Sequence, residues 1–283
     1  MPAGPAQAWV QALAPSEADE AALDRTRHPF ADELAQVRAA LRRRGSTVHA
    51  VHPADEAALW RRADLAEDFV FGDRHFMARA VAALGREAAV AGSYPRALAG
   101  LLGRAHRIGP AREVLAETSA SVRPCFVKPS RPCFVDGHKL QAQVVPGPLQ
   151  LDALPPELRE RELIVAELVE WMSEYRCYVR HSRILGVHAY HLRLPEGWPP
   201  GQAEAIEDAL PEMRPSLAWL QDAVQRLDAA GESVAGYCLD VGLIAFGAMA
   251  LVEMNDGLAL TNHGLADDDY LALHLARWRE LMG

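Results

Sequence analysis

Apolar residues in the first part of the chain follow helical and strand spacing in turn. Leu34, Val37 and Leu41 recur at the spacing of one helix face, and Gly45 supplies a stop after them. Short runs rich in β-branched and aromatic residues predict strands between the helices. The expected elements are helices over residues 31–44, 53–60, 74–84 and 111–119 and strands over residues 47–51 and 68–72. This alternation favours a small α/β layer.

Two segments of this first part show neither spacing. Residues 1–30 are rich in Ala, Pro, Glu and Asp, and we expect a loosely held lead-in there. Residues 92–110 contain Gly, Pro, Arg and small residues, which are typical of a boundary or crossover. We therefore divide the chain into a lead-in (1–30), an N-terminal α/β domain (31–120) and a second domain (121–283).

A short motif is repeated where the second domain begins. Arg-Pro-Cys-Phe-Val occupies residues 123–127 and again residues 131–135, and each copy predicts a short strand behind a proline. Lys128 follows the first copy, and Lys139 follows the second in a turn before an expected strand over 140–145. Such a clamp suits an oligophosphate, because ammonium groups neutralise charge while loop amides donate hydrogen bonds. The spacing of a P-loop is lacking, so that fold is disfavoured.

Alternating residues predict more strands further along the second domain. The expected elements are strands over 163–171, running into a connector, over 173–180 and over 184–191, and helices over 216–231 and 268–281. Glu174 and Arg176 are two residues apart and therefore share one face of their strand. The turn-forming residues Asn262, His263 and Gly264 are well placed to border a site.

The stretch from Gly236 to Gly257 predicts a β-hairpin with acids inside two apolar runs. A turn centred on Phe246-Gly247 would place Asp240 opposite Glu253. Asn255 shares the face of Glu253, because side chains alternate along a strand. Two carboxylates and an amide oxygen would then converge, which is a set that Mg²⁺ prefers and that is unfavourable without a cation. The alternative is a pair of ordinary strands with solvent-facing acids.

Composition draws attention to the two lysines. Of 29 basic side chains, only Lys128 and Lys139 are lysine, and the others are arginine. A compact ammonium on a flexible stem differs from a planar guanidinium in hydration and geometry. These two positions are therefore candidates for a requirement that arginine does not meet.

Charge and cysteine content narrow the class of protein. Half of the 283 residues are hydrophobic, which is enough for one large or two modest domains. The net charge of -9 argues against a general binder of nucleic acid or anionic membranes. No membrane-spanning run and no signal peptide is recognisable, so we expect a cytoplasmic protein. The four cysteines show no Cys-x-x-Cys spacing and are expected to be reduced core residues.

Six motifs follow one another in the second domain. They are Val127-Lys128-Pro129, the loop with Lys139, Glu167-Leu168-Val169-Glu170-Trp171, Ser173-Glu174-Tyr175-Arg176, Asp240-Val241-Gly242 and Leu251-Val252-Glu253-Met254-Asn255-Asp256. Over residues 120–265 this order resembles the ATP-grasp superfamily, and more narrowly its clade named for one arginine and two lysines. The resemblance implies an α/β (α+β) chain with an ATP-grasp fold over 121–283 behind an N-terminal α/β pre-ATP-grasp domain.

The resemblance also implies roles for individual residues. These are phosphate contacts for Lys128 and Lys139, a γ-phosphate or acyl-phosphate contact for Arg176, backbone contacts to adenine for Glu167, Leu168 and Val169, a ribose contact for Glu170 or Glu174, and one or two Mg²⁺ ions on Asp240, Glu253 and Asn255.

The reaction implied by the resemblance is ATP- and Mg²⁺-dependent ligation of carbon to nitrogen. A substrate carboxylate would attack the γ-phosphate, and an amine would then displace phosphate from the acyl phosphate, with a small molecule, amino acid or peptide as substrate. Such chemistry relies on cations and alignment rather than on a protein nucleophile. Two alternatives are an ATP-grasp kinase that phosphorylates a hydroxyl and a nucleotide-binding regulatory module without turnover.

Overall fold

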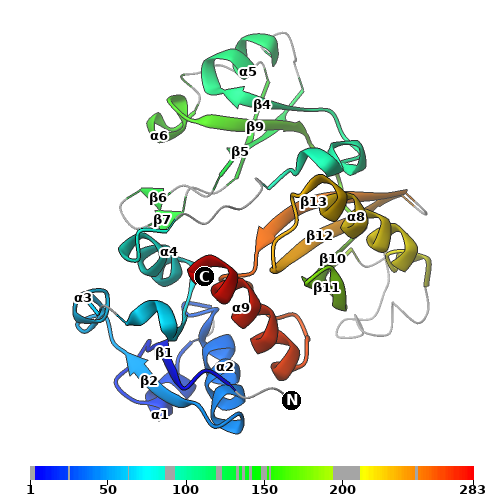
Figure 1. Cartoon of the computed structure of the whole chain (residues 1–283). Helices are drawn as coiled ribbons and strands as arrows, with labels where there is room; N and C mark the ends of the chain where they lie inside the picture. Colours follow the sequence, from blue (N-terminus) through cyan, green and yellow to red (C-terminus); the bar gives the residue numbers. More distant parts are fainter. Residues whose placement is uncertain are drawn as a thin grey trace.

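The computed structural model describes residues 4–24, 26–62, 64–86, 93–118, 123–131, 134–135, 138–139, 142–147, 152, 154–193, 211–245 and 248–283. The strands in these ranges form one three-stranded sheet, two four-stranded sheets and a two-stranded hairpin. Figure 1 shows the N-terminal three-stranded sheet and the four-stranded sheet of residues 106–167 at opposite ends of the view. The four-stranded sheet of residues 173–256 and the C-terminal helix lie between them.

The N-terminal sheet is parallel, with the strand order β2-β1-β3. Its elements are β1 (Gln7–Gln11), α1 (Glu17–Ala21), α2 (Ala31–Arg43), β2 (Thr47–Val51), α3 (Glu56–Leu59), the 3-10 helix η1 (Leu65–Glu67), β3 (Phe69–Phe71) and α4 (Arg74–Ala83). The predicted alternation of strands and helices is confirmed. The prediction of a loosely held lead-in is wrong for β1, because this strand is central in the sheet and buries Ala8 and Val10.

The next sheet is antiparallel, with the strand order β4-β9-β5-β8. Its elements and neighbours are η2 (Arg96–Leu101), β4 (His106–Pro110), α5 (Ala111–Thr118), β5 (Cys125–Pro129), the hairpin of β6 (Phe134–Val135) and β7 (His138–Lys139), β8 (Gln143–Val145), α6 (Pro156–Arg159) and β9 (Glu162–Glu167). The first copy of the repeated motif gives β5, and the described part of the second gives β6. Residues 92–110 were interpreted as a boundary or crossover, and the structure adds strand β4 at the end of this segment, where it pairs with β9 at the sheet edge. The division at residue 120 stays a prediction.

The remaining sheet is also antiparallel, with the strand order β11-β10-β12-β13. Its elements are β10 (Ser173–Arg180), β11 (Arg183–Leu192), the 3-10 helix η4 (Pro211–Met213), α8 (Leu217–Ala230), β12 (Gly236–Ala245), β13 (Ala248–Asp256) and α9 (Asp267–Met282). The hydroxyl of Ser216 caps α8, and Gly231 ends it in the left-handed conformation that glycine favours. The predicted strands and both predicted helices are therefore present.

The hairpin of β12 and β13 has the predicted pairing of its acids. Asp240 lies opposite Glu253, and the register shifts by one residue directly after this pair. The predicted turn centre, Phe246-Gly247, lies outside the described residues. Helix α8 packs on the sheet face that carries Tyr175 and Leu239. Because side chains alternate, the acids lie on the other face of the sheet.

Helix α9 connects the N-terminal sheet to the end of β13. Leu271 and Trp278 of α9 share a core with Phe69 and Phe71 of β3. The Arg277 guanidinium donates two hydrogen bonds of 2.9 Å to the Asp256 carboxylate at the end of β13. This contact fixes the strand that carries the predicted metal ligands against the N-terminal unit.

Three of the four cysteines are described, and all three are buried free thiols, as predicted. Burial raises the pKa of Cys177 to about 12, so this thiol stays protonated and unreactive. Cys133 lies outside the described residues. In the described part of the chain, no helix combines the length and apolar character that crossing a membrane requires.

Candidate functional site

The predicted metal ligands lie together on the face of the β12–β13 hairpin opposite α8. The Nδ2 atom of Asn255 donates hydrogen bonds to Asp240 Oδ2 at 2.9 Å and to Glu253 Oε1 at 3.0 Å. Two carboxylate oxygens therefore converge on one amide group. The structure thus brings together the three residues that the sequence singled out, while their role as ligands stays a prediction.

Arg176 pairs with Asp240 through both oxygens of the carboxylate. Its Nε and Nη2 atoms donate to Oδ1 and Oδ2, each at 2.8 Å, because β10 and β12 place the two residues side by side. Burial lowers the pKa of Arg176, but neighbouring acidic groups, Asp240 among them, raise it above the ordinary arginine value. Burial raises the pKa of Asp240, and the guanidinium opposes that rise. The bidentate geometry keeps this pair charged.

Lys128 reaches the site from the other antiparallel sheet. Its Nζ atom on β5 donates to Glu253 Oε2 on β13 at 2.7 Å. The residue is only 8% exposed, and its ammonium lies 4.7 Å from the centre of the Tyr94 ring, where a cation–π contact stabilises it. The site therefore lies where the two four-stranded sheets meet.

The resulting cluster pairs cations with carboxylates. Two cations, Lys128 and Arg176, contact the carboxylates of Glu253 and Asp240 respectively, and Asn255 links the two acids. Such a network offers hydrogen-bond donors to an oligophosphate through its cations and oxygen ligands to a metal ion through its carboxylates. Among the described residues, no group of three or more His, Cys, Asp and Glu side chains is placed to hold a metal. Beside the two carboxylates, the amide oxygen of Asn255 is the further oxygen donor that this cluster offers to a cation.

The segment predicted to hold adenine begins at Glu167, the last residue of β9. The Glu167 carboxylate accepts the backbone N–H of Ala105 at 2.9 Å, and the Glu167 N–H donates to the Ala105 carbonyl at 3.0 Å. Leu168 is 44% exposed, which is unusual for a large apolar side chain. Leu168 and Val169 lie outside any described strand, so they form a connector between the two antiparallel sheets.

The two candidate ribose ligands lie in different surroundings. Glu170 pairs with Arg193 at 2.8 Å, and 87% of its side chain is exposed. Glu174 accepts the Tyr190 hydroxyl at 2.7 Å beside Arg176. Burial, Asp240 and Glu174 raise the pKa of Tyr190, so its hydroxyl stays a donor.

Lys139 is placed only by its backbone, which pairs with Phe134 in the β6–β7 hairpin. Its side chain lies outside the part of the chain that the structure describes. Its predicted phosphate contact therefore stays a prediction.

Sequence reasoning missed several residues that shape the site. Arg104 donates to the carbonyls of Leu251 and Val252 at 2.8 and 2.9 Å, and so holds the β13 backbone beside Glu253. Thr261 accepts a hydrogen bond of 2.7 Å from Arg176 Nη1. No local signal distinguishes Arg104 among so many arginines, whereas the turn residues after β13 did indicate the loop that carries Thr261.

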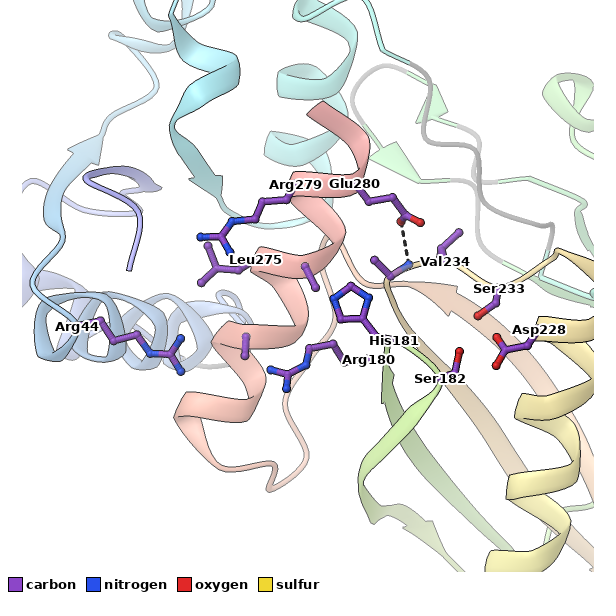
Figure 2. A pocket seen from close by; sticks show the side chains of 13 residues that line it. Arg44, Arg180, His181, Ser182, Asp228, Ser233, Val234, Leu275, Arg279 and Glu280 are labelled. Carbon is purple, nitrogen blue, oxygen red and sulfur yellow. Dashed lines mark hydrogen bonds between the residues drawn. The ribbon is translucent and has the colours of Figure 1, made fainter. Parts of the chain in front are cut away.

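A separate hollow of about 700 Å³ lies along α9, the β10–β11 turn and the start of β12. Figure 2 shows Arg44, Arg180 and Arg279 around it, together with Glu280. None of the predicted site residues lines it. Arg44 donates to Asp268, and Glu280 accepts the Ala235 N–H at 2.8 Å, so part of its charge is already used in structural contacts. We therefore place the candidate site at the acidic hairpin.

Comparison with models of protein families supports the predicted fold. The model of an ATP-grasp domain family matches residues 102–273; it is family 2 of the clade named for one arginine and two lysines. No curated protein sequence matches the chain significantly.

Two solved structures share the architecture. The ADP complex of purK, N5-carboxyaminoimidazole ribonucleotide synthetase, is 14% identical with a TM-score of 0.52, over 93% of this chain and 72% of that one. The N5-carboxyaminoimidazole ribonucleotide synthetase from Thermotoga maritima is 10% identical with a TM-score of 0.50, over 95% and 76% of the two chains. At these identities the likeness concerns the fold, which is the predicted one.

Proposed function

Because the chain belongs to this second family of the one-arginine, two-lysine clade of ATP-grasp domains, we propose that it is an ATP- and Mg²⁺-dependent carboxylate–amine ligase. In the proposed reaction, a carboxylate oxygen of an amino acid or peptide attacks the γ-phosphorus and ADP leaves. An amine then attacks the acyl phosphate and phosphate leaves.

One observation carries the proposal: the Lys128–Glu253 and Arg176–Asp240 ion pairs lie in a single cluster linked by Asn255. Phosphoryl transfer needs cations for the phosphate oxygens and carboxylates for a metal, and it needs them at one place. We assign the phosphate contacts to Lys128 and Lys139, and the contact to the transferring phosphoryl group to Arg176.

The residues present suit Mg²⁺ as well. Asp240, Glu253 and the amide of Asn255 are hard oxygen donors, and a half-turn of the amide about its terminal torsion would replace its NH₂ group by its oxygen. When bound, Mg²⁺ neutralises phosphate charge and orients the phosphates. The chain itself positions the carboxylates of Asp240 and Glu253, because Asn255 donates a hydrogen bond to each of them.

For the nucleoside we assign the connector after β9 to adenine, through the backbone of Glu167, Leu168 and Val169. Leu168 and Val169 lie outside any described strand, so a sheet does not use their backbone groups, whereas the N–H of Glu167, the last residue of β9, already donates to the Ala105 carbonyl. Glu170 and Glu174 are both assigned as ribose candidates. Single alanine variants distinguish them. Replacing the residue that binds the ribose should raise the KM for ATP without lowering kcat, and replacing the other should leave the KM unchanged.

The deciding experiment measures the release of ADP and phosphate with a panel of amino acids and short peptides, offered as acids, as amines and together. Phosphate release that requires both an acid and an amine supports the ligase. Transfer of phosphate to a hydroxyl-bearing compound, or tight ATP binding without turnover under every condition, would refute it.

A further inference from the structure

The loop between β13 and α9 carries a histidine beside the site. The Nε2 atom of His263 lies 3.1 Å from Thr261 Oγ1, the same oxygen that accepts the 2.7 Å hydrogen bond from Arg176 Nη1. The His263 ring stacks on Tyr190 with ring centres 5.3 Å apart, and the Arg176 guanidinium carbon is 5.6 Å from the centre of that Tyr190 ring. The imidazole therefore lies next to the guanidinium that we assign to the transferring phosphoryl group.

The backbone around His263 is fixed from both sides. The N–H of His263 donates to the Tyr178 hydroxyl at 2.9 Å. The N–H of Asn262 donates to Glu33 of α2 at 3.0 Å, and the Asn262 side chain exchanges two hydrogen bonds of 2.8 Å with the backbone of Leu265. Contacts of this kind hold the ring in one place, which a group that transfers a proton requires.

The charge state of His263 follows from its neighbours. Burial lowers the pKa of His263 to about 4, and the positive charges of Arg176 and His188 lower it as well. The ring is therefore neutral near pH 7. Tyr190, whose ring stacks on the imidazole, has a protonated hydroxyl that donates to Glu174. A phosphate anion at Arg176 would offset its positive charge and make the imidazole more basic.

The position of the single ring proton decides what the histidine can do. Arginine only donates, and a threonine oxygen can accept two hydrogen bonds. A threonine hydroxyl also donates one, so the contact between Nε2 and Thr261 Oγ1 accommodates either tautomer. In the tautomer with the proton on Nε2, Nδ1 keeps a lone pair. This arrangement of an oriented ring with one unprotonated nitrogen is the one that general bases use.

We propose, as an extension of the proposed ligase function, that Nδ1 of His263 accepts the proton of the attacking amine. The lone pair of the amine nitrogen forms the bond to the acyl carbon. The bond from that carbon to the phosphate oxygen breaks, and phosphate leaves with the electron pair. One N–H proton passes to Nδ1. The earlier step, in which the carboxylate displaces ADP, releases no amine proton and does not need this base.

The test separates the two half-reactions in His263→Asn. Hydroxylamine is uncharged at neutral pH and traps acyl phosphates as hydroxamates without needing the base. With ATP, Mg²⁺ and the amino-acid panel, His263→Asn should form hydroxamate at roughly the wild-type rate, while amide formation falls by about 10²- to 10⁴-fold. His181→Asn is the matched control, because His181 lies in the β10–β11 turn with a positive φ of 45° that Asn tolerates. It should retain both activities.

Other outcomes contradict the inference in different ways. An equal fall in hydroxamate and amide would show a structural role, and unchanged amide formation would show that another group takes the proton. If the wild type forms neither product with any acid of the panel, the ligase proposal itself fails, and this inference fails with it. Independently of turnover, ¹⁵N NMR of the wild-type histidines should show His263 protonated on Nε2 at pH 7, and a proton on Nδ1 would overturn the assignment.

Discussion

Replacing Glu253 by glutamine perturbs the point where both halves of the site meet. Glu253 accepts from Lys128 at 2.7 Å through one oxygen and from Asn255 at 3.0 Å through the other. Glutamine keeps the shape, but one of the two terminal atoms becomes an NH₂ group. One of the two donors then faces another donor, and the charge that balances Lys128 is lost.

The size of the effect follows from the exposure of the pair. A hydrogen bond to a charged group contributes about 1.5–3 kcal/mol. The Lys128 side chain is 10% exposed, so losing its counter-charge is costly, but Glu253 is 30% exposed and solvent screens part of the effect. We expect the free energy of unfolding to fall by about 1–2 kcal/mol. In a chain of this size, that corresponds to a decrease in Tm of roughly 2–8 °C.

Thermal unfolding measured with and without a non-hydrolysable ATP analogue and Mg²⁺ tests both the fold and the site. A bound ligand raises the Tm according to its affinity, so the wild type should gain stability and Glu253→Gln should lose the part of the gain that depends on Mg²⁺. Glu160→Gln is the control, since its pair with Arg112 is 76% and 71% exposed and should contribute almost nothing. A Glu253→Gln variant that turns over ATP like the wild type would refute the assignment of this residue to the metal.

Three further changes test other parts of the site and fold. Lys128→Arg should lower kcat/KM for ATP at least about tenfold despite the retained charge, because the buried ammonium beside Tyr94 leaves little room for a planar guanidinium; steady-state kinetics at several ATP concentrations would show this. Burial lowers the pKa of His274 to about 3, so between pH 6.5 and pH 3 this side chain binds a proton in the unfolded protein but not in the folded one. The free energy of unfolding should therefore fall as pH falls through this range, by up to about 1.4 kcal/mol per pH unit, and His274→Gln should remove this contribution in urea titrations at several pH values. Asn255→Asp places a third carboxylate beside Asp240 and Glu253, so the Tm should fall without metal and Mg²⁺ should raise it more than in the wild type.

Local pattern was sufficient for the pairing of Asp240 with Glu253. The two strands are adjacent in the chain, and the acids interrupt apolar runs, so turn position and alternation determine which residues face each other. Local pattern failed for β1 and β4. Strand β1 offers only Ala8 and Val10 as an alternating apolar pair, and β4 is a largely exposed edge strand that contains Gly109 and ends in a proline.

The contact between Lys128 and Glu253 was beyond reach of the sequence for a different reason. The two residues are 125 positions apart, and they meet because two separate sheets pack against each other. The scarcity of lysine indicated one partner, and the hairpin indicated the other. What joins them is a tertiary arrangement that no local spacing encodes. The same holds for Arg104, whose partners are backbone carbonyls of a distant strand.

Asp240 has less capacity left for a metal than its chemistry alone implies. Its oxygens accept from Arg176 Nε and Nη2 at 2.8 Å and from Asn255 Nδ2 at 2.9 Å, and the Cys238 thiol lies 3.7 Å from Oδ1. A carboxylate offers about four acceptor positions, and four donors surround this one. A cation can reach Asp240 only when one of these donors moves away.

The two ion pairs differ in how readily they open. Arg176 and Asp240 are 12% and 3% exposed and share two hydrogen bonds, and breaking a buried pair of this kind costs about 3–5 kcal/mol. The pair of Lys128 and Glu253 reaches solvent on its acidic side and shares one hydrogen bond. We therefore expect nucleotide binding to open the Lys128 pair and to leave the Arg176 pair closed. Asn255 donates to both acids, so turning its amide removes one donor from each carboxylate and brings an oxygen in their place.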